Sequence, residues 1–180
     1  RGCRFSTYVH ERRENGSFKE QVLRLGPEAL LYEHHVLLDV VRAMQHLHCM
    51  LPPLFHLGLH PRSVLVEGRV PPLGKISDFS NGRIGDAGAG REEVLEEWQK
   101  MDIHAFGKLA IFTITGKEAG ARPRIRASDW GAEKVGSLAG VCHIAKSCVT
   151  RNPQQRPDFR KVYLAISDLT ALLNLTILAS

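Results

Sequence analysis

The sequence predicts a mainly helical fold with one small β-hairpin near the middle of the chain. Three stretches place apolar residues three or four positions apart, the spacing that gathers them on one face of a helix. Two short apolar and β-branched runs, separated by glycine and proline, indicate a hairpin. With 180 residues, the chain is long enough for one domain with its own hydrophobic core.

Composition limits the class of protein. A hydrophobic fraction of 43% and a charged fraction of 24% are those of an ordinary soluble globular domain. The net charge of +5 is spread along the chain, and its densest group, Arg122, Arg124 and Arg126, is more typical of a solvated loop than of a nucleic-acid surface. No run of about 18 uncharged apolar residues is present. We therefore expect neither a nucleic-acid partner nor a membrane span.

The cysteines bear on metal binding and cellular location, and the first residue bears on whether the chain is part of a longer protein. None of the four cysteines stands in a Cys-x-x-Cys pair, which argues against a zinc site and fits a reducing, cytoplasmic location. The chain begins at Arg1 rather than at methionine, so we expect it to be a piece of something longer.

The first predicted helix runs from Leu30 to His48 and ends before Pro52 and Pro53, because proline cannot continue a helix. Its predicted buried face consists of Val36, Leu37, Val40, Val41, Met44 and Leu47. The predicted hairpin pairs 63–66 with 74–77. Four glycines without a hydrophobic pattern make 81–90 a predicted loop.

The second half of the chain is predicted to contain three helices. The first covers 102–115 and stops at Gly116, and an irregular stretch follows over 119–128. The second covers 133–149, and the last starts near Pro157. The apolar positions expected to be buried in the first and last of these helices are Ile103, Phe106, Leu109, Ile114, Phe159, Val162, Ile166, Leu169 and Leu173.

Two motifs in the middle of the chain carry a resemblance to a known family. Residues 56–66 read H-L-G-L-H-P-R-S-V-L-V, and 75–80 read K-I-S-D-F-S. The first resembles the H-R-D-L-K-x-x-N catalytic loop of protein kinases, and the second resembles their D-F-G motif. His56, Asp78 and Phe79 match the family pattern, whereas most of the reactive groups differ.

Four further segments resemble the same family in the same order. They are E-N-G-S-F at 14–18, D-V-V-R-A-M-Q-H-L-H at 39–48, D-I-H-A-F-G at 102–107, and the C-x-x-x-N-P-x-x-R-P-x-F pattern at 148–159. Together they resemble the C-terminal lobe of a eukaryotic protein kinase, and their motifs are most similar to those of the tyrosine-kinase-like and receptor-interacting group. The resemblance covers 1–180 as one domain.

The resemblance divides that domain into five parts. They are a hinge-following segment near 8–18, a catalytic-loop remnant at 56–66, a shortened activation segment at 78–101, a central helix at 102–115 and C-terminal helices at 133–175. The N-terminal lobe of the family would precede Arg1, and no A-P-E motif ends the activation segment.

Several positions that carry the family's chemistry hold other residues. Gly58 stands where the family has its catalytic aspartate, and His60 stands where it has a phosphate-binding lysine. Ser63 replaces a magnesium-binding asparagine, which leaves Asp78 as the intact metal ligand. Loss of a positioned general base costs on the order of 10²–10⁴ in rate. These substitutions predict no catalytic residue and no enzyme, with Asp78 and Ser63 as vestigial cofactor-binding positions and Asp78 as the candidate metal ligand.

Other matching positions are structural in the family. The resemblance implies structural roles for His56, Phe79, Asp102 and Arg156. Asp102 is expected to cap the central helix and to bond to the catalytic-loop backbone. Arg156 would pair with the glutamate of A-P-E, and because that motif is absent we expect Glu96 or Glu97 to take its place.

The leading interpretation is a catalytically inactive, degraded kinase, or pseudokinase, that serves as a binding or regulatory scaffold in intracellular signalling. It would have no cofactor, and a protein partner or an N-lobe in cis would cover its exposed lobe interface. One alternative is a residual kinase with substituted catalytic residues, for which ATP and magnesium are expected only with an upstream N-lobe. A second alternative is a kinase-like dimerisation platform for an attached effector such as a ribonuclease.

Overall fold

The structure is a computed structural model that describes residues 2–4, 7, 27–67, 71–85, 92–120 and 136–178. The hinge-following segment predicted near 8–18, most of the arginine-rich stretch 119–128 and the first residues of the helix predicted at 133–149 lie outside these ranges.

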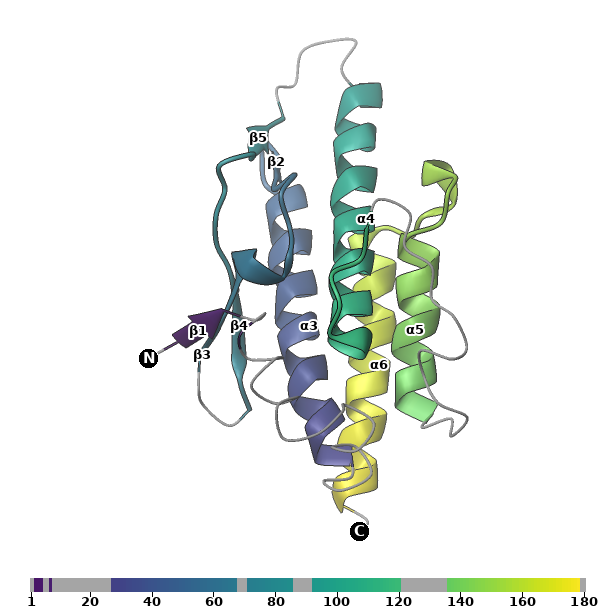
Figure 1. Ribbon diagram of the computed structural model, residues 1–180. Coiled ribbons are helices and arrows are strands. Elements are labelled where there is room, and N and C mark those ends of the chain that lie inside the picture. The colour runs from purple at the N-terminus through teal and green to yellow at the C-terminus, as the bar shows by residue number, and fades with distance from the viewer. Residues whose placement is uncertain are drawn as a thin grey trace.

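In the part of the chain that the structure describes, four long helices form the body of the molecule, and a small sheet covers one side of it (Figure 1). The helices are α3 (Pro27–His48), α4 (Glu92–Thr115), α5 (Gly136–Cys148) and α6 (Phe159–Leu178). Helix α3 packs against α6 on one side and against strand β4 (Leu73–Ile76) on the other, and α4 packs against α5. This mainly helical arrangement with small antiparallel sheets is consistent with the predicted kinase-like C-lobe.

The predicted hairpin is confirmed. Strand β3 (Val64–Glu67) pairs antiparallel with β4, with Val64 opposite Ile76, and β1 (Gly2–Arg4) pairs with the other edge of β3. Helix α3 holds the hairpin closely, because the Gly74 N–H donates to Asp39 Oδ2 over 3.0 Å. A Cβ atom at Gly74 would lie 3.0 Å from the Val36 carbonyl oxygen, so this close approach favours glycine.

A second, two-stranded sheet was not predicted. Strand β2 (Leu54–Phe55) pairs with β5 (Arg83–Ile84), which falls in the stretch 81–90 that we expected to be entirely loop. Each strand is only two residues long, too short to leave a period-two pattern in the sequence. The pairing fixes the start of the catalytic loop against the segment that follows Asp78.

The hydrophobic core lies between the helices, and the periodicity of the sequence located it correctly. The predicted apolar positions of all three helices are buried, except that Leu47 and Leu169 are partly buried. Glu33 and His34 of α3 are also buried. Burial, and to a smaller extent the neighbouring His35, lowers the pKa of His34 to about 4, so His34 is neutral at pH 7.

Helix α4 begins at Glu92 and not at residue 102, so the predicted start of the central helix is wrong. The residues before Asp102 include good helix formers, and Glu92 and Glu93 in the first turn are stabilised by the helix dipole. Asp102 therefore lies inside α4, and the expectation that it caps this helix is also wrong. The predicted end is confirmed, because Gly116 adopts a φ of 67° and its N–H donates to the Phe112 carbonyl over 2.7 Å.

The close contact between α4 and α5 depends on a residue without a side chain. A Cβ atom at Gly107 would lie 2.7 Å from the Cβ of Cys148. Helix α4 thereby comes close to α5 at the level of the catalytic loop. Among the helices in the described part of the chain, none is both long and apolar enough to cross a membrane.

Candidate active site

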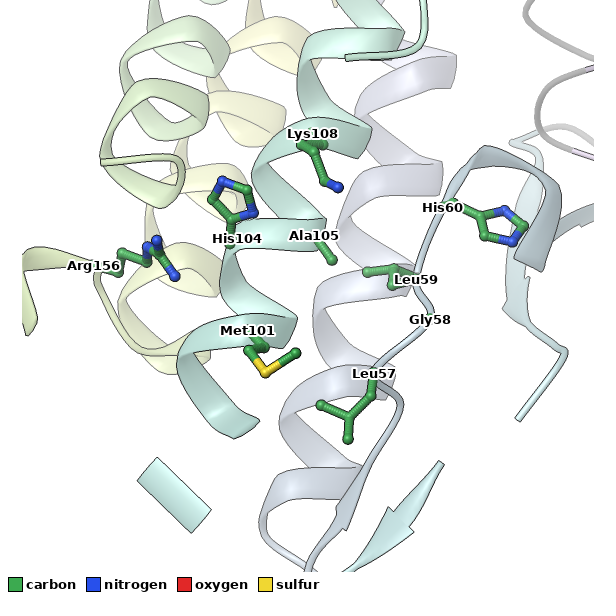
Figure 2. A pocket seen from close by; sticks show the side chains of 9 residues that line it. All are labelled: Leu57, Gly58, Leu59, His60, Met101, His104, Ala105, Lys108 and Arg156. Carbon is green, nitrogen blue, oxygen red and sulfur yellow. The ribbon is translucent and has the colours of Figure 1, made fainter. Parts of the chain in front are cut away.

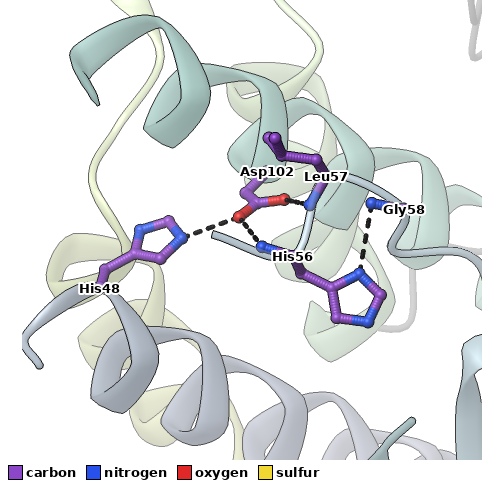
Figure 3. Close-up of polar contacts among 5 residues, drawn as sticks. All are labelled: His48, His56, Leu57, Gly58 and Asp102. Atoms are coloured by element: carbon purple, nitrogen blue, oxygen red, sulfur yellow. Dashed lines mark hydrogen bonds and ion pairs between the residues drawn. The ribbon is translucent and has the colours of Figure 1, made fainter. Parts of the chain in front are cut away.

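A single buried carboxylate organises the catalytic loop from within (Figure 3). Asp102 is fully buried, and its Oδ2 accepts hydrogen bonds from the backbone N–H of His56 and from His48 Nε2, both over 2.9 Å. Its Oδ1 accepts from the Leu57 N–H over 2.8 Å. The expected contact between Asp102 and the catalytic-loop backbone is therefore present, and His48 is a third donor that the sequence did not reveal.

His56 connects the catalytic loop to the segment that carries Asp78. Its Nδ1 accepts from the Gly58 N–H over 3.2 Å, so its Nε2 carries the proton and donates to the Ser77 carbonyl over 3.0 Å. The ring also lies 4.7 Å from the ring of Phe79, measured between centroids. The two motifs recognised in the sequence are thus joined directly by His56.

Two residues of the site adopt backbone conformations that are uncommon outside glycine. The φ angle is 52° at Leu57 and 63° at Asp78, both in the left-handed region. At Leu57 the hydrogen bond from its N–H to Asp102 helps to hold this conformation. These two backbone conformations change the direction of the chain within the site, and the residue types alone did not predict them.

Asp78 presents a charged carboxylate to solvent. Its Oδ1 accepts from Ser80 Oγ over 2.8 Å. The hydroxyl and the backbone N–H of Ser80 lower the pKa of Asp78, and His60 and His56 lower it further. Asp78 therefore remains ionised at neutral pH.

His60 and Ser63 build the short 3-10 turn η1 (Pro61–Ser63). His60 Nδ1 accepts from the N–H groups of Arg62 and Ser63 over 3.0 and 3.2 Å. Ser63 Oγ accepts from the His60 N–H over 3.0 Å and donates to the His60 carbonyl over 2.9 Å. Ser63 is fully buried, so its hydroxyl is committed to this turn rather than open to a metal ion.

Gly58 follows Leu57 in the catalytic loop. A Cβ atom at this position would lie 3.0 Å from Asn81 Nδ2, the end of an exposed side chain that can move. Among the described glycines, Gly116 has a positive φ and Gly58 does not. The backbone at Gly58 can therefore accept a side chain.

An open pocket of about 330 Å³ lies between the catalytic loop and α4 (Figure 2). Helix α4 contributes Met101, His104, Ala105 and Lys108, the loop contributes 57–60, and Arg156 closes one end. Figure 2 shows the Leu59 side chain pointing toward the side of α4 that carries Ala105 and Lys108, whereas the His60 ring turns away from the helix. This pocket was not predicted from the sequence, although the spacing of Met101, Ala105 and Lys108 on one helix could have indicated a shared face.

Arg156 binds backbone carbonyls instead of the expected glutamate. Its Nη1 donates to the Lys100 carbonyl over 2.9 Å, and its Nε donates to the Thr150 carbonyl over 3.1 Å. Lys100 Nζ in turn donates a hydrogen bond to the Arg156 carbonyl over 3.0 Å. Neither Glu96 nor Glu97, both of which the structure describes, lies within ion-pair distance of Arg156, so that predicted pairing is not found.

Comparison with curated proteins relates the chain to protein kinases at a distance. It is 26% identical over 178 residues to a probable serine/threonine-protein kinase of Dictyostelium discoideum, with 88% of the chain and 17% of that protein covered. It is 22% identical over 212 residues to LysM domain receptor-like kinase 10 of Oryza sativa subsp. japonica, with 91% of the chain and 35% of that protein covered. No family model matches the chain.

The chain is thus distantly related to protein kinases, and it spans only about a sixth and a third of the length of these two relatives. This finding corrects one prediction from the sequence. The substitutions at Gly58, His60 and Ser63 led us to predict that the chain is not an enzyme, yet its relatives are named as protein kinases, which are enzymes. A missing side chain at one catalytic position does not by itself establish inactivity, because transition-state electrostatics and substrate positioning also contribute to the rate.

Proposed function

We propose that this chain forms the catalytic-loop lobe of a protein-kinase-like phosphotransferase with substituted catalytic residues, which binds magnesium nucleotide together with an N-lobe. The observation that carries the proposal is the Asp102 centre, which holds the loop at its inner side while Asp78 stays charged and exposed. A purely structural loop would not require an outward carboxylate in a left-handed turn.

The donor set of the site fits a magnesium ion that arrives with phosphates. Magnesium in phosphate-transfer enzymes is bound by one or two carboxylates plus substrate phosphate oxygens and waters. Asp78 would supply the carboxylate. In the described part of the chain no three His, Cys, Asp or Glu side chains gather into a metal site, so the remaining ligands would be phosphate and water. When bound, the ion would neutralise phosphate charge.

His60 would act on the phosphates as a hydrogen-bond donor. Because its Nδ1 accepts two backbone N–H groups, the proton of the neutral ring resides on Nε2. His60 therefore presents an N–H donor at the position where the kinase family places a lysine. It also lies close to Asp78, since His60 in its protonated form lowers the pKa of that carboxyl.

Nucleotide binding through Asp78 can be tested by thermal unfolding of the intact protein with ATP and with ATP plus Mg²⁺. We expect a magnesium-dependent stabilisation, about 2.7 kcal/mol at a nucleotide concentration near 100 times Kd. Asp78→Asn should abolish it. Asp158→Asn is the matched control, because Asp158 Oδ1 accepts from the Lys161 N–H and an asparagine oxygen can do the same. No shift, or an equal shift in Asp78→Asn, would refute the proposal.

Restoring the family's catalytic carboxylate provides a second test. The Cβ atom that Gly58→Asp introduces would lie 3.0 Å from Asn81 Nδ2, and the new carboxylate could accept a hydrogen bond from that amide. We expect transfer of labelled γ-phosphate from ATP to rise by a factor on the order of 10² or more, the usual contribution of a positioned base. The double variant with Asp78→Asn should lose this gain. A Gly58→Asp protein that folds and binds nucleotide without any rise would show that the base position is not functional.

A binding role in signalling is a second candidate, and it can coexist with the first. Exposed apolar side chains cluster around β2 and β5, where Leu51 is 97% and Ile84 is 66% exposed. Such a surface favours a covering protein partner or the N-lobe in cis. Introducing Ile84→Asp should weaken the association of the chain with whichever partner covers it, measured by co-purification of the intact protein.

A further inference from the structure

The pocket between the catalytic loop and α4 is lined by both apolar and basic side chains. Leu57, Met101 and Ala105 supply carbon surface, and Met101 is 47% exposed. His104, Lys108 and Arg156 supply nitrogen donors. Among the described residues that line the pocket, none is an aspartate or a glutamate.

The basic side chains of the pocket differ from three surface bases that form ion pairs with carboxylates. At the surface, Arg62 pairs with Glu118, Lys75 with Glu67 and Lys161 with Asp158. Within the ranges that the structure describes, no such partner lies beside Lys108 or Arg156. Their charges, after burial, lower the pKa of His104, which indicates a positive potential inside the pocket.

Two nitrogen atoms of the Arg156 guanidinium group hold it in place, and the third is available to a ligand. Its Nε and Nη1 donate to the Thr150 and Lys100 carbonyls, and Nη2 makes no hydrogen bond to any described residue. A fixed guanidinium loses little side-chain entropy when it binds an anion. This arrangement favours a carboxylate at the end of the pocket that Arg156 closes.

We propose that this pocket binds an acidic side chain of a protein partner, with an adjacent apolar side chain resting on Leu57 and Met101. Charge complementarity selects the acidic residue, and the exposed carbon surface selects a neighbouring leucine-like side chain rather than a free inorganic anion. The volume of about 330 Å³ suits a few side chains of an extended segment. The pocket shares Gly58 and His60 with the proposed phosphotransfer site but does not include Asp78, so a variant of Asp78 separates the two proposals.

The test uses a fluorescein-labelled peptide of alternating glutamate and leucine, titrated into the intact protein by fluorescence anisotropy. Its control has glutamine in place of glutamate. We expect the acidic peptide to bind at least tenfold more tightly than the control, and Lys108→Met to remove most of that difference. Lys117→Met is the matched variant, since Lys117 is exposed just after α4, outside the pocket. It should leave binding unchanged.

Four results would overturn the proposal. They are equal binding of the two peptides, equal loss of binding in Lys108→Met and Lys117→Met, competition by millimolar inorganic phosphate that matches the unlabelled acidic peptide, and loss of peptide binding in Asp78→Asn. The first two would indicate non-specific attraction, and the third would indicate an anion site without peptide selectivity. The fourth would place the peptide at the nucleotide position and leave the magnesium-nucleotide proposal to be judged separately by its thermal shift.

Discussion

The inner and outer sides of the catalytic loop differ in how much of the kinase pattern they keep. On the inner side, Asp102 and His56 match the family and make the hydrogen bonds that hold the loop backbone. On the outer side, Gly58 and His60 replace residues that would touch substrate or phosphate. The comparison teaches that Asp102 and His56 hold the shape of the loop without supplying its chemistry, whereas His60 on the outer side both caps the η1 turn and stands at a phosphate-binding position.

The largest expected effect lies on the inner side. Asp102→Ala removes the acceptor of three hydrogen bonds and leaves two buried loop N–H groups unpaired, which should lower the free energy of unfolding by about 3–5 kcal/mol. Urea denaturation followed by circular dichroism would measure it. Asp168→Ala, an exposed position on α6, should stay within about 0.5 kcal/mol. If the two variants were equally stable, the loop would not depend on Asp102.

We expect part of the loss of unfolding free energy at acidic pH to come from a buried histidine. His34 has a folded pKa of about 4 against 6.5 when unfolded, so below pH 6.5 the unfolded state binds a proton that the folded state does not. Its stability contribution is complete above pH 6.5 and is lost as the pH falls to 4, by up to about 3 kcal/mol. His34→Leu should flatten this loss in urea melts between pH 7 and 4. The exposed His143→Gln should not, and an unchanged slope in His34→Leu would contradict the assignment.

A smaller effect tests whether the outer side is also structural. His60→Ala removes the cap of the η1 turn and should cost about 1 kcal/mol of unfolding free energy. His60→Asn retains a side-chain oxygen that can accept from the same N–H groups, so stability should return while magnesium-nucleotide binding stays weak. If His60→Asn restored both, His60 would serve only the turn, and the distinction between the two sides would fail there.

The smallest effect concerns the pocket. Lys108→Met removes one of the two positive charges that lower the pKa of His104, so this pKa should rise toward its ordinary value. Two-dimensional NMR of the His104 ring across pH 4–8 would follow it. Lys117→Met removes an equal charge outside the pocket and should leave the His104 titration in place. An equal shift in both variants would mean that His104 senses net charge rather than its neighbours.

Local sequence patterns predicted most of the fold. Periodicity identified the buried faces of α3, α4 and α6, since apolar residues three and four apart must share a helix face. It missed the start of α4 because 92–101 is too polar to show a buried stripe, although its residues favour helix.

The site itself was predictable only by residue type. The motifs located Gly58, His60 and Asp78, but not their contacts. The bonds of Asp102 to His48 and of Arg156 to Lys100 join residues 54 and 56 positions apart. No local sequence pattern predicts a bond between residues so far apart in the chain. None predicts the left-handed backbone conformation of Leu57 beside Asp102 either. The pocket was missed for the same reason, because its lining comes from three separate segments.

The position of Asp102 also has a consequence for how the chain folds. Its carboxylate joins the end of α3, the catalytic loop and the middle of α4, with partners 45 to 54 residues away in sequence. Closing loops of this length costs entropy that must be recovered by packing, so contacts of such separation slow folding and form after local helices. The loop can therefore reach its native shape only after α3 and α4 have docked. Hydrogen exchange at the Leu57 amide during refolding would report the completion of tertiary structure.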